Sequence, residues 1–258
     1  MVGWSDLWLF ALPAMLFWSA GAVLSLGGRR QGLACLLTVG GLLTFGAFIA
    51  LMWQSTGHPP LRTMGETRLW YAFFLPLVGL ATYLRWHYRW VLSFSTLLSG
   101  VFICVNLLKP ELHGKVLMPA LQSPWFAPHV IIYMFAYATT GAATLLALWH
   151  LMHEEKPVSA IDELTGVGLS FLTVGMLFGA LWAKEAWGTY WSWDPKETWA
   201  AATWLCYLIY LHLRKCRPYE DRMALLWLLV CFVCLQMCWW GINYLPSAQG
   251  VSVHTYSS

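Results

Sequence analysis

The sequence predicts an all-α, polytopic integral membrane protein. Of its 258 residues, 59% are hydrophobic and only 10% are charged, and the mean hydropathy is +0.58. A soluble domain has about 25% charged residues, and disordered segments are poor in apolar residues. The composition therefore excludes both a soluble globular enzyme and a disordered chain.

Eight apolar stretches define the expected transmembrane helices. A helix needs roughly 20 apolar residues to cross the hydrocarbon core, and the candidate stretches are residues 7–26, 33–53, 69–84, 90–108, 130–149, 166–183, 198–213 and 223–245. The third and the seventh are short, so a partly re-entrant segment is an alternative for either. The connecting segments are too short for a soluble domain, and we expect one membrane-embedded domain over residues 1–258.

Lysine and arginine predict the orientation of the chain. Cytoplasmic loops carry the excess of positive charge, and an N-terminus on the outer side places nine of the fifteen basic residues in cytoplasmic loops. Compact pairs such as Arg29 and Arg30 carry most of this signal. We therefore expect both termini on the outer side. Asp6 precedes the first stretch, which is the reverse of the positive segment that opens a signal peptide, so this stretch is expected to stay as a helix.

The cysteines carry no disulfide pattern. Six of the seven fall inside the expected helices, and Cys216 follows the seventh stretch. Cys231 and Cys234 have Cys-x-x-Cys spacing, but they lie among apolar neighbours, where cysteine usually acts as a small hydrophobic residue. We expect no disulfide framework.

The segment from Trp182 to Trp199 is the most distinctive part of the sequence. From Trp187 onward it reads Trp187-Gly-Thr-Tyr-Trp-Ser-Trp-Asp-Pro-Lys-Glu-Thr-Trp199, and these thirteen positions include five aromatic residues. Part of it has a structural explanation, since Asp194 can cap a helix in which Pro195 comes first and Glu197 completes a capping box. An interfacial belt explains two or three of the rings. Five rings beside a glycine favour a platform for a large, flat, apolar ligand.

These residues resemble the tryptophan-rich WWD segment of the haem-handling proteins of cytochrome c maturation. The ending Trp191-Ser-Trp-Asp-Pro-Lys-Glu-Thr-Trp199 is similar to the CcsA/ResC branch of that superfamily, which also includes CcmC and CcmF. The CcmC branch, which passes haem to a chaperone, departs from this pattern after the aspartate. The resemblance covers residues 125–258 well and residues 57–66 more weakly.

The resemblance implies cytochrome c biogenesis in the cell inner membrane or an equivalent energy-transducing membrane. Haem b is the implied ligand, bound transiently as a substrate at residues 182–199 on the outer, periplasmic or lumenal, face. The implied contacts within this segment are Trp187, Tyr190, Trp191, Trp193, Asp194 and Trp199. The implied partners are a CcsB/ResB-like membrane subunit and an apocytochrome c with a Cys-x-x-Cys-His motif, and no nucleic acid is implied.

The family also places one histidine on either side of the aromatic segment as axial ligands of the haem iron. His129 and His254 match those positions. The expected topology agrees, because two helices separate each histidine from the aromatic segment and so bring all three to one face. Neutral imidazole is a normal iron ligand. By itself, His129 would be read as an interfacial residue and His254 as part of a free terminus.

His212 lies in the last turn of the seventh stretch. The resemblance implies that this histidine supplies one ligand to a second haem on the cytoplasmic side, with the other ligand from the companion subunit. The alternative is an interfacial side chain that reaches the headgroups beside Arg214. We expect no ligand role for the remaining histidines, namely His58, His87, His113, His150 and His153.

Three classes of function fit a membrane protein of this kind. The first, which we favour, is a haem-binding subunit of a cytochrome c synthase, or haem lyase, that presents haem to an apocytochrome, and we identify no nucleophile or general base in it. The second is a b-type electron-transfer cytochrome, but only His212 is truly intrahelical. The third is a secondary transporter, which would show internal repeats and broken helices, and we find neither.

Overall fold

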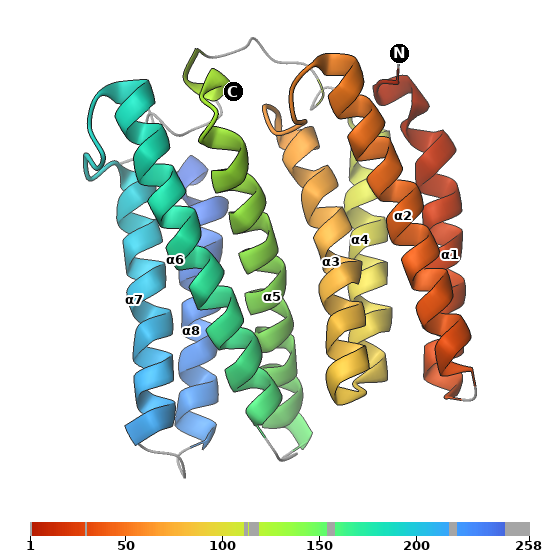
Figure 1. Ribbon diagram of the computed structural model, residues 1–258. Coiled ribbons are helices and arrows are strands. Elements are labelled where there is room, and N and C mark those ends of the chain that lie inside the picture. The colour runs from red at the N-terminus through yellow and green to blue at the C-terminus, as the bar shows by residue number, and fades with distance from the viewer. Residues whose placement is uncertain are drawn as a thin grey trace. The chain divides into compact units, whose positions relative to one another are not determined.

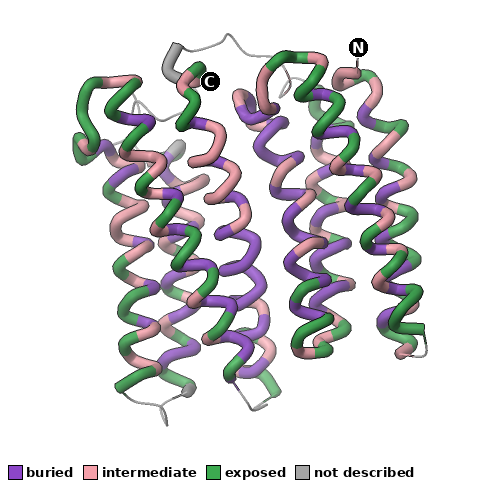
Figure 2. The backbone as a smooth tube through the Cα atoms, viewed as in Figure 1, coloured by how far each residue is buried: buried purple, intermediate pink, exposed green. Residues whose placement is uncertain are grey.

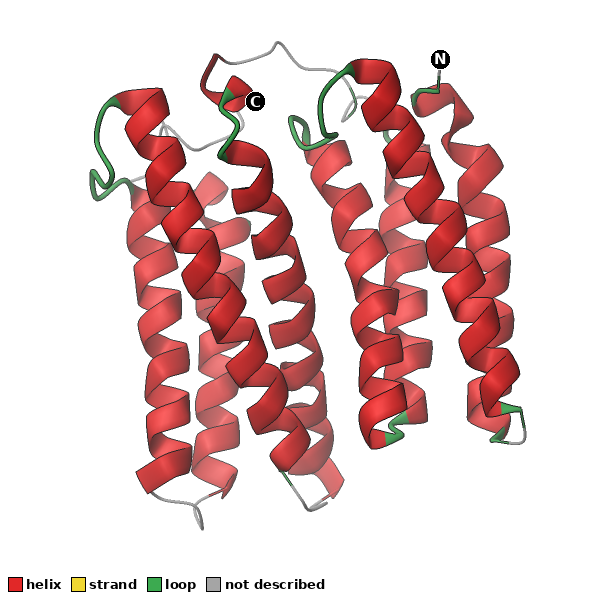
Figure 3. Ribbon diagram, viewed as in Figure 1, coloured by secondary structure: helices red, strands yellow, loops and turns green. Residues whose placement is uncertain are grey.

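The computed structural model describes residues 2–28, 30–110, 113, 119–153, 158–216 and 221–245. Figure 3 shows that these residues form helices joined by short loops, with no strand among them. The described helices are α1 (Leu7–Gly27), α2 (Gln31–Thr56), α3 (Met64–Trp86), α4 (Arg89–Leu108), α5 (Phe126–His153), α6 (Ser159–Trp187), α7 (Pro195–Cys216) and α8 (Asp221–Trp239). Each overlaps one of the expected stretches, which confirms the all-α class, and the number of membrane crossings stays a prediction. Short 3-10 turns cover Trp4–Asp6, Pro119–Gln122 and Gly241–Tyr244.

Helices α3 and α7 correspond to the two stretches that seemed short. They are continuous helices of 23 and 22 residues, because their polar ends extend beyond the apolar stretch that the sequence shows. Among the described residues, six helices are long and apolar enough to cross a membrane, namely α1, α2, α4, α5, α6 and α8. The chain is therefore a multi-pass membrane protein, and the side that each terminus faces stays a prediction.

The helices group into two compact units, residues 1–117 and 118–258 (Figure 1). In the first unit, α1 packs against α2 and α4, and α3 packs against α4. In the second unit, α5 packs against α6 and α8, and α7 packs against α8. Figure 2 shows that α5 is buried along most of its length. The single domain that the sequence predicts stays a prediction.

The two units share one local motif that the sequence analysis missed. In each, a helix ends at a left-handed glycine, a residue six positions later caps the next helix, and a glutamate three positions further accepts a hydrogen bond from the N–H of the capping residue. The residues are Gly57, Thr63 and Glu66 in the first unit and Gly188, Asp194 and Glu197 in the second. The intervening residues differ completely, so the motif is a repeat of backbone geometry rather than of sequence.

Candidate functional site

The aromatic loop, residues 187–199, joins the end of α6 to the start of α7. Gly188 ends α6 with a φ of 84°, a left-handed conformation that glycine adopts without steric cost. The N-terminus of α5 lies at the same end of the second unit (Figure 1). Residues early in α5 and residues of the aromatic loop therefore belong to one end of this bundle.

Two carboxylates hold the backbone of the aromatic loop. Glu197 Oε2 accepts hydrogen bonds from the N–H groups of Ser192, at 2.8 Å, and Asp194, at 3.1 Å. Asp194 Oδ1 accepts a hydrogen bond from Lys196 N–H at 2.8 Å. Both acidic residues are buried. The predicted cap at the start of α7 is confirmed, since Asp194 accepts from the Lys196 N–H and Glu197 accepts from the Asp194 N–H.

The aromatic side chains of the loop differ in how far they are exposed. Tyr190 is 57% exposed and Trp193 is 70% exposed, whereas Trp187, Trp191 and Trp199 are half-buried. Trp191 and Trp193 meet edge to face, with ring centroids 5.7 Å apart. The indole N–H of Trp191 is buried and has no hydrogen-bond acceptor within the described ranges. Trp193 has a φ of 60°, which is strained for a bulky side chain.

Lys184 illustrates how side chains at the end of α6 pack onto this loop. Its Nζ donates to the carbonyl oxygen of Gly188 at 2.8 Å and lies 5.4 Å from the centre of the Tyr190 ring. This contact is a cation–π interaction at an exposed site, which contributes about 0.5–1 kcal/mol. The lysine therefore helps to fix the loop.

The structure brings His129 close to the aromatic loop through Trp182. His129 lies in the first turn of α5, and its ring centroid is 5.5 Å from that of Trp182 on α6. Trp182 in turn lies 4.8 Å from Trp187, the first ring of the loop. The Nδ1 atom of His129 is 2.8 Å from the carbonyl oxygen of Gly175. Sequence reasoning included Trp182 in the expected haem-binding segment 182–199 without giving it a separate role, and it did not single out Gly175.

Of the other two predicted histidine ligands, only His212 is described, and it lies away from this cluster. His254 lies outside the described residues. His212 is exposed near the opposite end of α7, where the Sγ atom of Cys216 is 3.6 Å from its Nε2 atom. Within the described ranges, no three histidine, cysteine, aspartate or glutamate residues are arranged to hold a metal ion.

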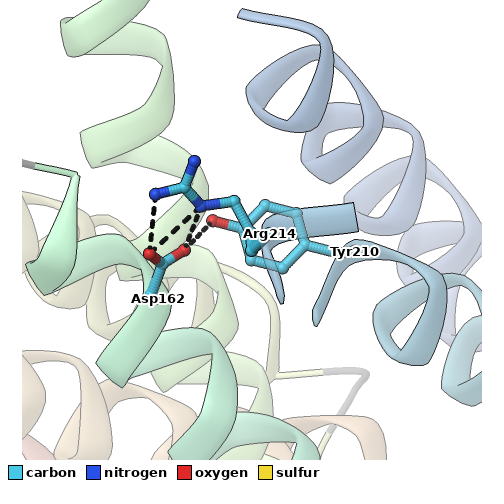
Figure 4. Close-up of polar contacts among 3 residues, drawn as sticks. All are labelled: Asp162, Tyr210 and Arg214. Atoms are coloured by element: carbon cyan, nitrogen blue, oxygen red, sulfur yellow. Dashed lines mark hydrogen bonds and ion pairs between the residues drawn. The ribbon is translucent and has the colours of Figure 1, made fainter. Parts of the chain in front are cut away.

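A second polar cluster lies near His212. Figure 4 shows Asp162 of α6 facing Tyr210 and Arg214 of α7. Asp162 Oδ1 accepts hydrogen bonds from the Tyr210 hydroxyl at 2.6 Å and from Arg214 Nε at 2.9 Å, and Oδ2 accepts from Arg214 Nη2 at 2.9 Å. Two parallel bonds between a guanidinium and a carboxylate fix the relative position of the helices that carry them. This cluster therefore joins α6 to α7 at the end opposite the aromatic loop.

Comparison with known proteins decides the family. Residues 66–248 match the family model described as Cytochrome C assembly protein. The chain belongs to the cytochrome c assembly protein family. The match includes the aromatic loop, His129 and His212 and stops short of His254.

Individual members of the family confirm the resemblance to the CcsA branch. The chain is 34% identical over 228 residues to the cytochrome c biogenesis protein CcsA of Chlamydomonas reinhardtii, which covers 81% of this chain and 64% of that protein. It is 31% identical to CcsA of Synechococcus sp. (strain CC9902), with 96% of this chain and 92% of that protein covered. The solved structure of the cytochrome c haem lyase CcmF superimposes with a TM-score of 0.68 at 18% identity and covers 92% of this chain and 46% of CcmF. This last similarity shows a shared fold.

Proposed function

We propose that this chain acts in cytochrome c biogenesis by holding haem against the aromatic loop, with His129 as one axial ligand of the iron. The observation that carries the proposal is the position of His129. It lies beside Trp182, which contacts the first ring of the loop, and its Nδ1 atom lies within hydrogen-bond distance of a backbone carbonyl. Histidines that bind metals almost always donate their other ring N–H to such an acceptor.

The exposed rings of the aromatic loop also support haem binding. Tyr190 and Trp193 offer flat apolar surface that the second unit does not use for its own core. A ligand that covers the Trp193 indole would shield apolar surface that a strained backbone holds exposed. The Trp191 N–H is a buried donor, and an acceptor such as a haem propionate would satisfy it. Trp187 and Trp199, which begin and end the aromatic loop in sequence, are half-buried.

His254 is the proposed second axial ligand on the outer face. With two imidazoles on the iron, the haem is held until an apocytochrome arrives, and the histidine of its Cys-x-x-Cys-His motif replaces one of them. Each cysteine thiol of that motif then adds across one haem vinyl group, so that a carbon–sulfur bond forms and the thiol hydrogen goes to the other vinyl carbon. Because this addition has no leaving group, the contribution of the chain is proximity and orientation.

His212 is the proposed ligand of a second haem at the cytoplasmic end, together with a histidine of a CcsB/ResB-like subunit. The exposure of His212 at the end of α7 is compatible with a ligand shared between two chains. The haem at this end would supply the outer site. The proposal places the chain in a synthase complex in an energy-transducing membrane and does not give it a separate soluble activity.

The first test replaces His129 with Ala in the full-length protein, expressed together with its membrane partner and purified in detergent. We expect loss of most of the low-spin haem absorption and of cytochrome c maturation, and partial recovery of both on adding imidazole. His153→Ala is the matched control, since His153 is exposed at the far end of the same helix and stacks on Trp149. Unchanged haem in His129→Ala, or loss without recovery by imidazole, would contradict the ligand assignment.

A further inference from the structure

We propose that Gly175 and Gly179 of α6 are positioning residues for the His129 imidazole, which they orient and whose basicity as an iron ligand they raise. This inference rests on the proposed function of His129 as a haem ligand. It assigns a role to two residues that are one helical turn apart and lie outside the aromatic loop in sequence.

Gly179 provides the space that the imidazole occupies. A Cβ atom built at Gly179 would lie 2.8 Å from both the Cε1 and Nδ1 atoms of His129, which is closer than real Cβ contacts. The ring therefore rests directly on the backbone of α6, and any side chain at this position would push it away. Because the imidazole is a rigid ring on a short stem, it has to rotate about its own χ angles to escape the clash.

Gly175 and Tyr133 hold the same ring from another side. Tyr133 meets His129 edge to face, with ring centroids 4.6 Å apart. A Cβ atom at Gly175 would lie 3.1 Å from the Tyr133 ring, so this glycine makes room for the ring that flanks the histidine. The two glycines thus accommodate two aromatic rings of α5, which meet edge to face, against α6.

The carbonyl group of Gly175 fixes the tautomer of the ring. With Nδ1 donating its proton to this oxygen at 2.8 Å, a neutral imidazole carries its lone pair on Nε2, the atom that ligates iron. A hydrogen bond from the distal ring N–H to a carbonyl raises the basicity of the ligand. A more basic ligand stabilises ferric over ferrous iron and lowers the midpoint potential of the haem.

The alternative is that these glycines serve only the close packing of α5 on α6, as small residues do between membrane helices. Helix α6 contains the controls that separate the two explanations. A Cβ atom at Gly168 would lie 2.5 Å from Thr140 Cγ2, which is a tight contact between the same two helices, away from His129. A Cβ atom at Gly166 would have nothing within 4 Å.

The test compares Gly179→Ala with Gly168→Ala and Gly166→Ala in the full-length protein, expressed with its membrane partner. The measurements are haem per chain, the low-spin absorption spectrum and the haem midpoint potential. For Gly179→Ala we expect about a tenfold weaker retention of haem, which is typical for loss of a partner that orients a metal ligand, and a higher midpoint potential in the haem that remains. Both control variants should keep the wild-type spectrum and potential.

The following outcomes decide between the positioning role and close helix packing. The positioning role is wrong if Gly179→Ala has the same haem content, spectrum and potential as Gly166→Ala while His129→Ala loses haem. It is also wrong if Gly168→Ala changes the spectrum and potential as much as Gly179→Ala does. If His129→Ala keeps its haem, the proposed function itself fails. Should Gly179→Ala not accumulate, the double variant with His129→Ala provides the answer, since removing the ring removes the clash. Recovered accumulation supports the inference, and continued absence overturns it.

Discussion

Trp193 allows the structural and functional demands on the aromatic loop to be separated. Its ring is 70% exposed and its φ is 60°. A left-handed conformation costs a residue other than glycine roughly 1–2 kcal/mol. The part of the ring that is buried, about 30% of a large aromatic side chain, corresponds to roughly 75 Å² and about 2 kcal/mol. The two effects are therefore of similar size.

The pair Trp193→Ala and Trp193→Gly distinguishes between them. Both variants lose the ring, but only glycine relieves the left-handed backbone. We expect the alanine variant to be about 2 kcal/mol less stable than the wild type and the glycine variant to be about 1 kcal/mol more stable than the alanine variant. For a chain of this size, 1 kcal/mol is about 2–4 °C in Tm. Thermal unfolding in detergent, followed by tryptophan fluorescence, measures the difference.

Haem retention and cytochrome c maturation should not follow the order of stability of the two Trp193 variants. If the ring is part of a haem platform, both variants should retain haem equally poorly and mature little cytochrome c, even though the glycine variant is more stable. Trp8→Ala is the matched control, because Trp8 is 53% exposed on α1, outside the aromatic loop. A glycine variant less stable than the alanine variant would refute the strain argument. Full maturation in Trp193→Ala combined with Trp191→Ala would refute the platform.

Two further predictions concern the other end of α7. Asp162→Ala removes the acceptor of Tyr210 and Arg214, and because the Asp162 side chain is 30% exposed, we expect a loss of about 2 kcal/mol in unfolding free energy. Tyr210→Phe should cost about 1 kcal/mol, and an unchanged Tm in both variants would show that the cluster does not hold α6 to α7. His212→Ala should lower the haem that reaches the aromatic loop in cells, while haem added to the purified protein still gives the His129-dependent spectrum. Normal loading in cells would remove His212 from the supply route.

Local side-chain chemistry explains why part of the site was predictable. The start of α7 depends on Asp194, Pro195 and Glu197, which act on backbone groups no more than five residues away. Such contacts are encoded in a short sequence and need no knowledge of the tertiary structure. Long apolar stretches likewise predict membrane helices without tertiary information. The all-helical membrane fold and the cap were therefore accessible from sequence.

The contacts around His129 were not accessible in the same way. His129 and Gly175 are 46 residues apart, and their contact depends on how α5 and α6 are rotated about their axes. A helix that is apolar on all sides has no polar face that fixes this rotation. The one available signal was the spacing of Gly175 and Gly179, four residues apart, which is typical of close helix packing in membranes. That spacing does not identify the residue that fills the gap.

The loop motif that occurs in both units shows which residues of the aromatic loop, 187–199, bear on haem binding. Glu66 accepts hydrogen bonds from two loop N–H groups before α3 in the same way that Glu197 does before α7. The loop in the first unit has this geometry without any tryptophan between its glycine and its cap. The hydrogen bonds of Asp194 and Glu197 in the Asp-Pro-Lys-Glu ending are therefore explained by helix capping. It follows that the exposed rings and His129, rather than that ending, carry the argument for haem.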